Sequence, residues 1–170
     1  MYHPGRGYSA LRRGRISIPL ATYFLTICTD KDRVGAHHTA CIETIRATIL
    51  ALGADGSIAH RMAVVMPDHM HWLFRLGERL TFPRVLARFK AKTKGALAVQ
   101  SLKWQENAFE HHLRPGENVW PILHYMFMNP YRAGLVQPDE RWPGFIFGEE
   151  DWEWFQDHVK DGLPYPEWLP

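Results

Sequence analysis

Cysteine is scarce in this chain of 170 residues, which contains only Cys28 and Cys41. The two cysteines form neither a CxxC motif nor the framework of a disulfide-rich secreted domain. Long apolar runs are also missing, because no stretch reaches the ~18 residues that a membrane-spanning helix needs. The first residues include arginines but lack the apolar segment of a secretory signal. We therefore expect a cytoplasmic protein with no membrane partner.

Acidic residues are absent from residues 1–16, where four arginines lie. The acids gather at the other end, because residues 137–170 hold nine acids and two bases, a net charge of −7. Residues 1–136 hold 18 bases and nine acids, or +9, although the whole chain carries only +2. A basic body of this kind suits a polyanion such as nucleic acid, and an ordinary solvated basic surface is the equally open alternative.

Hydrophobic residues make up 46% of the chain and include nine phenylalanines, seven tryptophans and six tyrosines. This composition excludes a wholly disordered chain, and the length indicates one domain with a buried core. We expect that domain over residues 19–147. A basic, irregular arm is expected over residues 1–18, and an acidic, tryptophan-rich tail over residues 148–170.

The hydrophobic pattern predicts alternating strands and helices. The expected strands are 22–29, 57–66, 69–76 and a short one within 104–113. The expected helices are 37–53, 81–99, 118–128 and a short one over 152–160. Gly53 should cap the first helix, Pro67-Asp68 should form a turn between two strands, and the last long helix should end or bend before Pro130. This order predicts an α+β fold with a mostly antiparallel sheet, and the absence of a glycine-rich phosphate loop excludes a Rossmann fold.

Two histidines stand two positions apart on the expected strand 69–76. Because alternate strand residues point to the same side, His69 and His71 share one face, and the opposite face is fully apolar. Two imidazoles on a rigid strand form a ready pair of metal ligands, although a third ligand has to come from elsewhere. The alternative is a pair of partly exposed histidines that bind nothing.

Tyr125 and Asn129 lie four positions apart in the last long helical segment and so share one helix face. A tyrosine hydroxyl can act as a nucleophile, and an amide oxygen can bind a hard metal ion. The more common roles are those of a core tyrosine and of a helix stop before proline. The residue pattern leaves both interpretations open.

Several segments together resemble a known family. VVMPDHMHWLF (64–74), WQENAFEHHL (104–113) and HYMFMNPYRAGLV (124–136), followed by Trp142-Pro143, resemble the single-tyrosine HUH transposases of bacterial insertion sequences. The resemblance is greatest to their domesticated branch, the REP-associated tyrosine transposases, and it extends from about residue 12 to about residue 147. It implies a ferredoxin-like antiparallel sheet with helices packed on it.

The resemblance also implies a function. Members of this family are metal-dependent single-stranded DNA endonucleases and strand transferases that cleave near hairpin or palindromic DNA through a 5′-phosphotyrosine intermediate. Carried over by position, Tyr125 matches the nucleophile, His69 and His71 match the HUH histidines, and Asn129 matches the third metal ligand. The implied cofactor is a divalent metal ion, Mg²⁺ or Mn²⁺. A second tyrosine, Tyr131, directly follows Asn129-Pro130 and is a further candidate for the site.

The implied partner is single-stranded or hairpin DNA, from a repetitive palindromic element or an insertion-sequence end, which would place the protein at the nucleoid. Phosphate contacts are expected from the basic arm and from helix 81–99. The residues concerned are Arg12, Arg13, Arg15, Arg88, Lys90, Lys92 and Lys94. Both a monomer and a homodimer fit the resemblance.

Two other functions are possible. A zinc hydrolase can open its site with an HxH pair, but no HExxH motif or evident second group of ligands is present. The other alternative is a non-catalytic hairpin DNA- or RNA-binding module on the same fold. Such a module would need neither the metal ligands nor the tyrosine.

Overall fold

The computed structural model describes residues 17–30 and 33–148. The elements in chain order are β1 (Thr22–Cys28), α2 (Thr39–Ala54), β2 (Ile58–Val65), β3 (His69–Leu76), α3 (Phe82–Val99), β4 (Phe109–His112), α4 (Trp120–Arg132) and β5 (Phe145–Ile146). None of the helices in these residues is both long and apolar enough to cross a membrane. The arm arginines Arg12, Arg13 and Arg15 and the expected helix over 152–160 lie outside the described residues.

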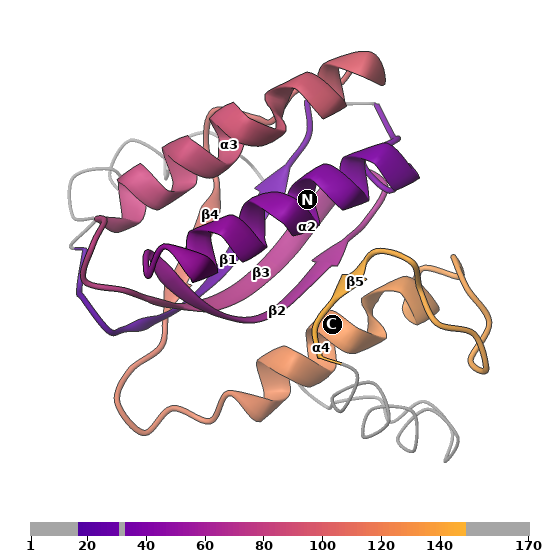
Figure 1. Ribbon diagram of the computed structural model, residues 1–170. Helices are drawn as coiled ribbons and strands as arrows, with labels where there is room; N and C mark the ends of the chain where they lie inside the picture. The colour runs from indigo at the N-terminus through magenta and orange to yellow at the C-terminus, as the bar shows by residue number, and fades with distance from the viewer. Residues whose placement is uncertain (1–16, 31–32, 149–170) are drawn as a thin grey trace, which may run out of the picture.

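The strands form one five-stranded sheet in the order β4-β1-β3-β2-β5 (Figure 1). Every neighbouring pair in it is antiparallel. The first six elements follow the β-α-β-β-α-β order of a ferredoxin-like domain, with α2 and α3 as the two crossovers. The expected α+β fold with helices packed on an antiparallel sheet is therefore confirmed.

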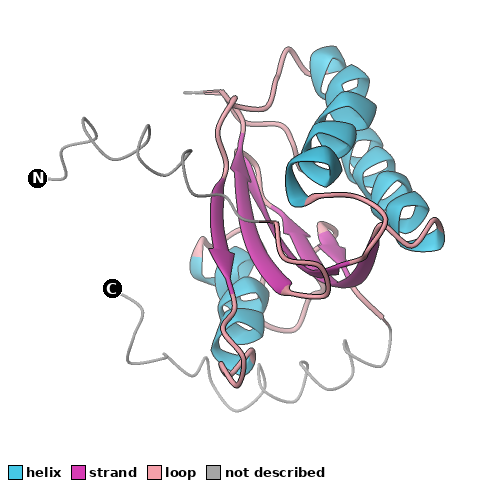
Figure 2. Cartoon of the chain, turned by 90° about the vertical axis from the view of Figure 1, so that its left-hand side faces the viewer, coloured by secondary structure: helices cyan, strands magenta, loops and turns pink. Residues whose placement is uncertain are grey.

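Helices cover both faces of the sheet, as Figure 2 shows. The pair α2 and α3 packs on one face and forms the larger core with it. Helix α4 packs on the opposite face and forms a second, separate core. The sheet is thus the middle layer of three, and the two faces of β3 contribute to different cores.

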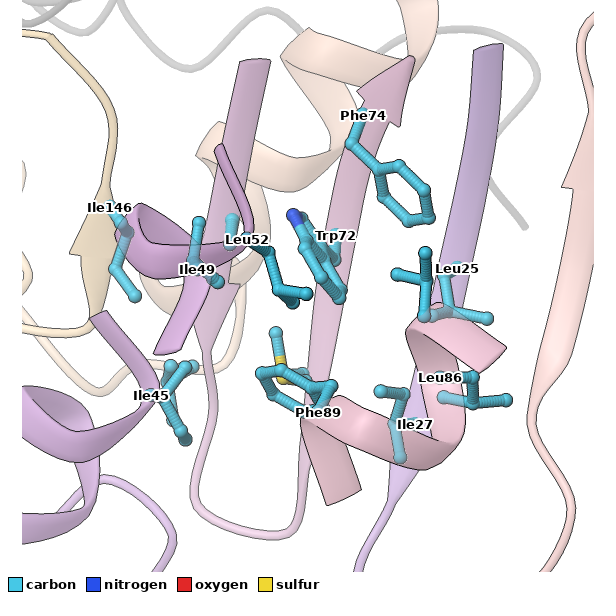
Figure 3. Close-up of a cluster of buried hydrophobic side chains, with 14 of the residues drawn as sticks. Leu25, Ile27, Ile45, Ile49, Leu52, Trp72, Phe74, Leu86, Phe89 and Ile146 are labelled. Carbon is cyan, nitrogen blue, oxygen red and sulfur yellow. The ribbon is translucent and has the colours of Figure 1, made fainter. Parts of the chain in front are cut away.

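The larger core follows from simple periodicity. On β3, the alternate residues Met70, Trp72 and Phe74 are fully buried toward α2 and α3, as the alternation predicts. Helix α2 adds Ile45 and Ile49, one turn apart on its buried side (Figure 3). Each such side chain stabilises the fold by about 1.5–3 kcal/mol through burial.

Two helix boundaries differ from the expectation. Gly53 does not cap α2 but lies inside it, because the helix continues to Ala54. Asp55 closes the turn that follows, and its Oδ1 accepts hydrogen bonds from the backbone N–H and the hydroxyl of Ser57. The glycine that the turn requires is Gly56, which has a φ of +75°. Helix α4 neither ends nor breaks before Pro130 but continues to Arg132. Pro130 is buried there, and packing on the sheet outweighs the hydrogen bond that proline cannot donate.

Candidate active site

The strand register gathers the chemically active side chains on the face of the sheet that α4 covers. Thr26 of β1 lies opposite His71 of β3 on one side and opposite Phe109 of β4 on the other. Residues directly opposite each other in antiparallel strands point to the same face. His69 and Phe24 belong to the same face, because each lies two positions from one of these residues.

The turn before β3 is held in place by hydrogen bonds from outside the hairpin. The backbone N–H and the hydroxyl of Thr29 donate to the carbonyl of Asp68, at 2.7 and 2.9 Å. The N–H groups of Gly35 and Ala36 donate to the carbonyl of Pro67, at 2.8 and 2.9 Å. The start of β3 is therefore fixed, and the histidine pair begins at this fixed point.

His69 is oriented by its neighbour. Its Nδ1 lies 2.6 Å from a carboxylate oxygen of Asp68, so Nε2 is the nitrogen that remains to bind a ligand. The ring of His69 lies 4.8 Å from that of His71, measured between centroids. The expectation that the two imidazoles share one face is thus confirmed, with a carboxylate behind the first.

His71 is buried, with 3% of its surface exposed. Its Nδ1 lies 2.8 Å from the hydroxyl of Thr26, which leaves Nε2 to face the site. Burial, with a smaller contribution from the charge of His69, lowers the pKa of His71 from 6.5 to about 3. His71 is therefore neutral at neutral pH, which is the state that a metal ligand requires. The sequence predicted a more polar surface here, but Phe24 of β1 and Tyr125 of α4 both pack against the ring.

The side chain of Tyr125 extends from α4 to the ring of His71. Its hydroxyl oxygen lies 3.4 Å from Nε2 of His71, and the two rings are 5.1 Å apart in a T-shaped arrangement. Phe24 stacks on His71 at 5.4 Å and meets Tyr125 edge-on at 6.3 Å. A pocket of about 400 Å³ opens beside these rings. It is lined by Phe24, Thr26, His71, Phe109, Ile122 and Tyr125.

Asn129 is half-buried and lies one helical turn after Tyr125, on the same face of α4. In residues 17–30 and 33–148, no three or more His, Cys, Asp or Glu side chains cluster so that they could hold a metal ion. Among these described residues a third protein ligand for the histidine pair would be of another type, and the Asn129 amide is the candidate that the sequence predicts.

The histidine pair fits a divalent metal ion. Each imidazole is engaged at Nδ1, His71 by the Thr26 hydroxyl and His69 by the Asp68 carboxylate, which leaves Nε2 of each ring for a ligand. Metal-binding histidines in proteins are held in the same way, with the second nitrogen bonded to an orienting partner.

The second tyrosine lies elsewhere. Tyr131 is buried against Phe127 and Phe145, and its hydroxyl donates a 2.8 Å hydrogen bond to the carbonyl of Glu140. Burial raises its pKa to about 12. Tyr131 therefore stabilises the packing of α4 and is not placed with His71.

The basic residues of α3 are not brought to this face, because α3 lies on the far side of the sheet from α4. Arg88 bonds to the Asp55 carboxylate, and Lys90 donates to the carbonyls of Gln105 and Glu106 at 2.7 and 3.0 Å. Lys92 lines a groove between α2 and α3, and Lys94 is exposed on α3.

Sequence reasoning did not assign a role to Thr26, Phe24 or Phe109. Alternation along β1 shows that Phe24 and Thr26 share a face, but only the register with β3 and β4 shows which residues they meet. Nothing in the sequence gives that register.

Comparisons with known proteins find related chains and a matching fold. No protein-family model matches the sequence. The chain is 25% identical over 134 residues to the REP-associated tyrosine transposase of Escherichia coli strain K12. The aligned segment covers 78% of this chain and 80% of that protein. The fold matches the solved structure of a REP-associated tyrosine transposase bound to a REP hairpin. The TM-score is 0.65 at 25% identity, over 92% of this chain and 90% of that one.

Proposed function

We propose that this chain, which is homologous to the REP-associated tyrosine transposases, is a DNA-processing protein of the transposase type and that Tyr125 is its nucleophile. In this proposal the protein is a metal-dependent single-stranded DNA endonuclease and strand transferase. The observation that carries it is the position of the Tyr125 hydroxyl, 3.4 Å from Nε2 of His71 in an HxH pair. The hydroxyl of the buried Tyr131 is instead bonded to the carbonyl of Glu140.

The metal ligands in this proposal are His69, His71 and Asn129, and the ion is Mg²⁺ or Mn²⁺. Imidazole nitrogen and amide oxygen suit these ions, Mn²⁺ better than Mg²⁺. When bound, the ion would polarise the scissile phosphate and offset its developing negative charge. Asp68 and Thr26 contribute by holding the two imidazoles in the binding orientation.

In the proposed reaction, the Tyr125 oxygen attacks the phosphorus of a DNA phosphodiester. A bond forms between that oxygen and phosphorus, and the bond from phosphorus to the 3′ oxygen breaks. The tyrosine loses its proton and the departing 3′ oxygen gains one, which leaves a 5′-phosphotyrosine and a free 3′-OH. Attack by a 3′-OH on the phosphotyrosine rejoins the strands, so no external energy source is needed.

The proposed substrate is hairpin or single-stranded DNA of a repetitive palindromic element. The related structure in complex with a REP hairpin supports this choice. A monomer and a homodimer are both compatible with it. The α3 cations stand across the sheet from Tyr125, so in this proposal they contact a part of the hairpin away from the cleaved bond.

A covalent-trapping experiment tests the proposal. Full-length protein is mixed with 3′-labelled single-stranded DNA that carries a palindromic hairpin from the same genome, with Mg²⁺ or Mn²⁺. The products are separated on a denaturing gel. We expect a protein–DNA band that is lost with chelator and in Tyr125→Phe but retained in Tyr131→Phe, which serves as the matched control.

Other outcomes would overturn parts of the assignment. A band that survives Tyr125→Phe would exclude Tyr125 as the nucleophile. Metal-dependent cleavage that survives replacement of both His69 and His71 by alanine would exclude them as ligands. Tight hairpin binding with no adduct under any metal condition would favour the non-catalytic binding module instead.

A further inference from the structure

The pocket beside Tyr125 extends beyond the residues that the proposed reaction uses. Tyr125, His71 and Thr26 contribute to its lining, and Phe24, Phe109 and Ile122 complete it. Its volume of about 400 Å³ lies within the ~300–1,000 Å³ range of ligand pockets. A pocket that combines reactive groups with aromatic rings suits a ligand that is partly anionic and partly flat and apolar.

Phe109 is the unusual member of this lining. It is 61% exposed, and it is the one aromatic among the exposed large hydrophobic residues of the described chain. It lies on β4, an edge strand of the sheet, where a large exposed apolar side chain invites wrong contacts. Its ring does little for the core, so a role in binding accounts for it better than a role in folding.

The register places Phe109 at a defined distance from the reactive groups. Phe109, Thr26 and His71 lie in one row across β4, β1 and β3. Two strand spacings of ~4.8 Å separate the backbones of Phe109 and His71 by roughly 10 Å. A single nucleotide can span this gap, with its phosphate at Tyr125 and its base at Phe109.

We propose that this pocket is a nucleobase subsite, in which an unpaired base next to the cleaved phosphodiester stacks on Phe109. This inference rests on the proposed function of Tyr125. Aromatic side chains bind bases of any sequence through their π faces, and the apolar lining offers few partners for base-specific hydrogen bonds. A base inside a duplex is stacked and paired and cannot enter. The subsite therefore also selects single-stranded DNA at the point of cleavage.

The test uses the full-length protein and the same 3′-labelled hairpin DNA, after the cleaved bond has been located from the length of the fragment that is released from a 5′-labelled copy. Single abasic sites are then placed at each nucleotide flanking that bond. Phe109→Ala removes the stacking ring, Phe109→Trp keeps one, and Leu50→Ala is the control. Leu50 is 60% exposed on α2, on the other side of the sheet.

We expect Phe109→Ala to slow adduct formation at subsaturating DNA by about 5- to 100-fold, the range that the loss of one base–aromatic stack gives. Phe109→Trp and Leu50→Ala should keep the wild-type rate. An abasic site at one flanking position should slow the wild type equally and should slow Phe109→Ala no further, because the same contact is removed twice. The melting temperature of the protein and its affinity for the hairpin stem alone, without the flanking single strand, should not change.

A second readout does not require cleavage. 2-Aminopurine at the position found above should be quenched when the DNA binds Tyr125→Phe, and not when Phe109→Ala is added to that variant. The subsite would be refuted, with Tyr125 still the nucleophile, if Phe109→Ala formed the adduct at the full rate. It would also be refuted if the effects of the abasic site and of Phe109→Ala multiplied. Loss of the wild-type adduct altogether would instead overturn the proposed function.

Discussion

The buried imidazole of His71 should make the stability of the metal-free protein depend on pH. In the folded protein, burial and the nearby His69 lower the pKa of His71 to about 3, against 6.5 in an open chain. Between these two values the unfolded chain binds a proton at His71 that the folded chain does not. The free energy of unfolding must therefore fall as the pH is lowered through this window.

The size of the effect follows from the two pKa values. Integrating the difference in bound protons gives a loss of about 2 kcal/mol between pH 7 and pH 5. Asp55 and Glu117 affect stability at a lower pH than this window, because the pKa values of their carboxyl groups are lowered from already acidic values. His37, whose pKa burial also lowers, adds a loss of the same sign.

Urea unfolding at pH 7 and pH 5 in the presence of EDTA measures the effect. His71→Gln removes the titrating group, so the wild type should lose about 2 kcal/mol more than this variant over the window. His37 is present in both proteins, and its contribution cancels. An equal loss in the wild type and in His71→Gln would refute the reasoning, because His71 would then be protonated in the folded protein.

Three further predictions follow from contacts in the structure. Thr26→Val removes the hydroxyl that orients the His71 imidazole and should lower the rate of adduct formation by about 10- to 100-fold, whereas Thr26→Ser should keep the rate. An unchanged rate in both variants would show that Thr26 does not position His71. Gly144→Ala would place a methyl group 2.2 Å from a backbone carbonyl of β2 and should lower the free energy of unfolding by about 1–3 kcal/mol. Gly53→Ala lies inside a helix with open space around it and should raise the free energy of unfolding by about 0.5–1 kcal/mol, and denaturant unfolding checks both signs. Replacing both Lys92 and Lys94 by glutamine should lower the log–log slope of hairpin affinity against salt by about 2 if each contacts one phosphate. An unchanged slope would exclude these two lysines from the interface.

The features set by local periodicity could be predicted from the sequence. Strand β3 spans the expected residues, and its apolar side is fully buried. The turn at Pro67-Asp68 and the pairing of His69 and His71 on one face follow from the same alternation. These properties depend on neighbours in the chain, which the sequence shows directly.

Features set by contacts between distant segments could not be predicted. The burial of His71 depends on α4 packing on that face, which a strand pattern does not indicate. The roles of Thr26 and Phe109 depend on register across β1, β3 and β4. Continuation of α4 through Pro130 also depends on tertiary packing, which outweighs the local tendency of proline to end a helix.

The two halves of the site are supported by different parts of the fold, and this determines how each can be disturbed. The histidine pair lies on a central strand whose first residue follows a turn held by four hydrogen bonds from outside the hairpin. Tyr125 lies on α4, which is held to the sheet by the smaller core, in which Phe127 stacks on Phe145 at 5.3 Å. Damage to that core should displace the tyrosine while leaving the two imidazoles in place. The distance between the Tyr125 hydroxyl and His71 is therefore the part of the site that depends most on the packing of α4.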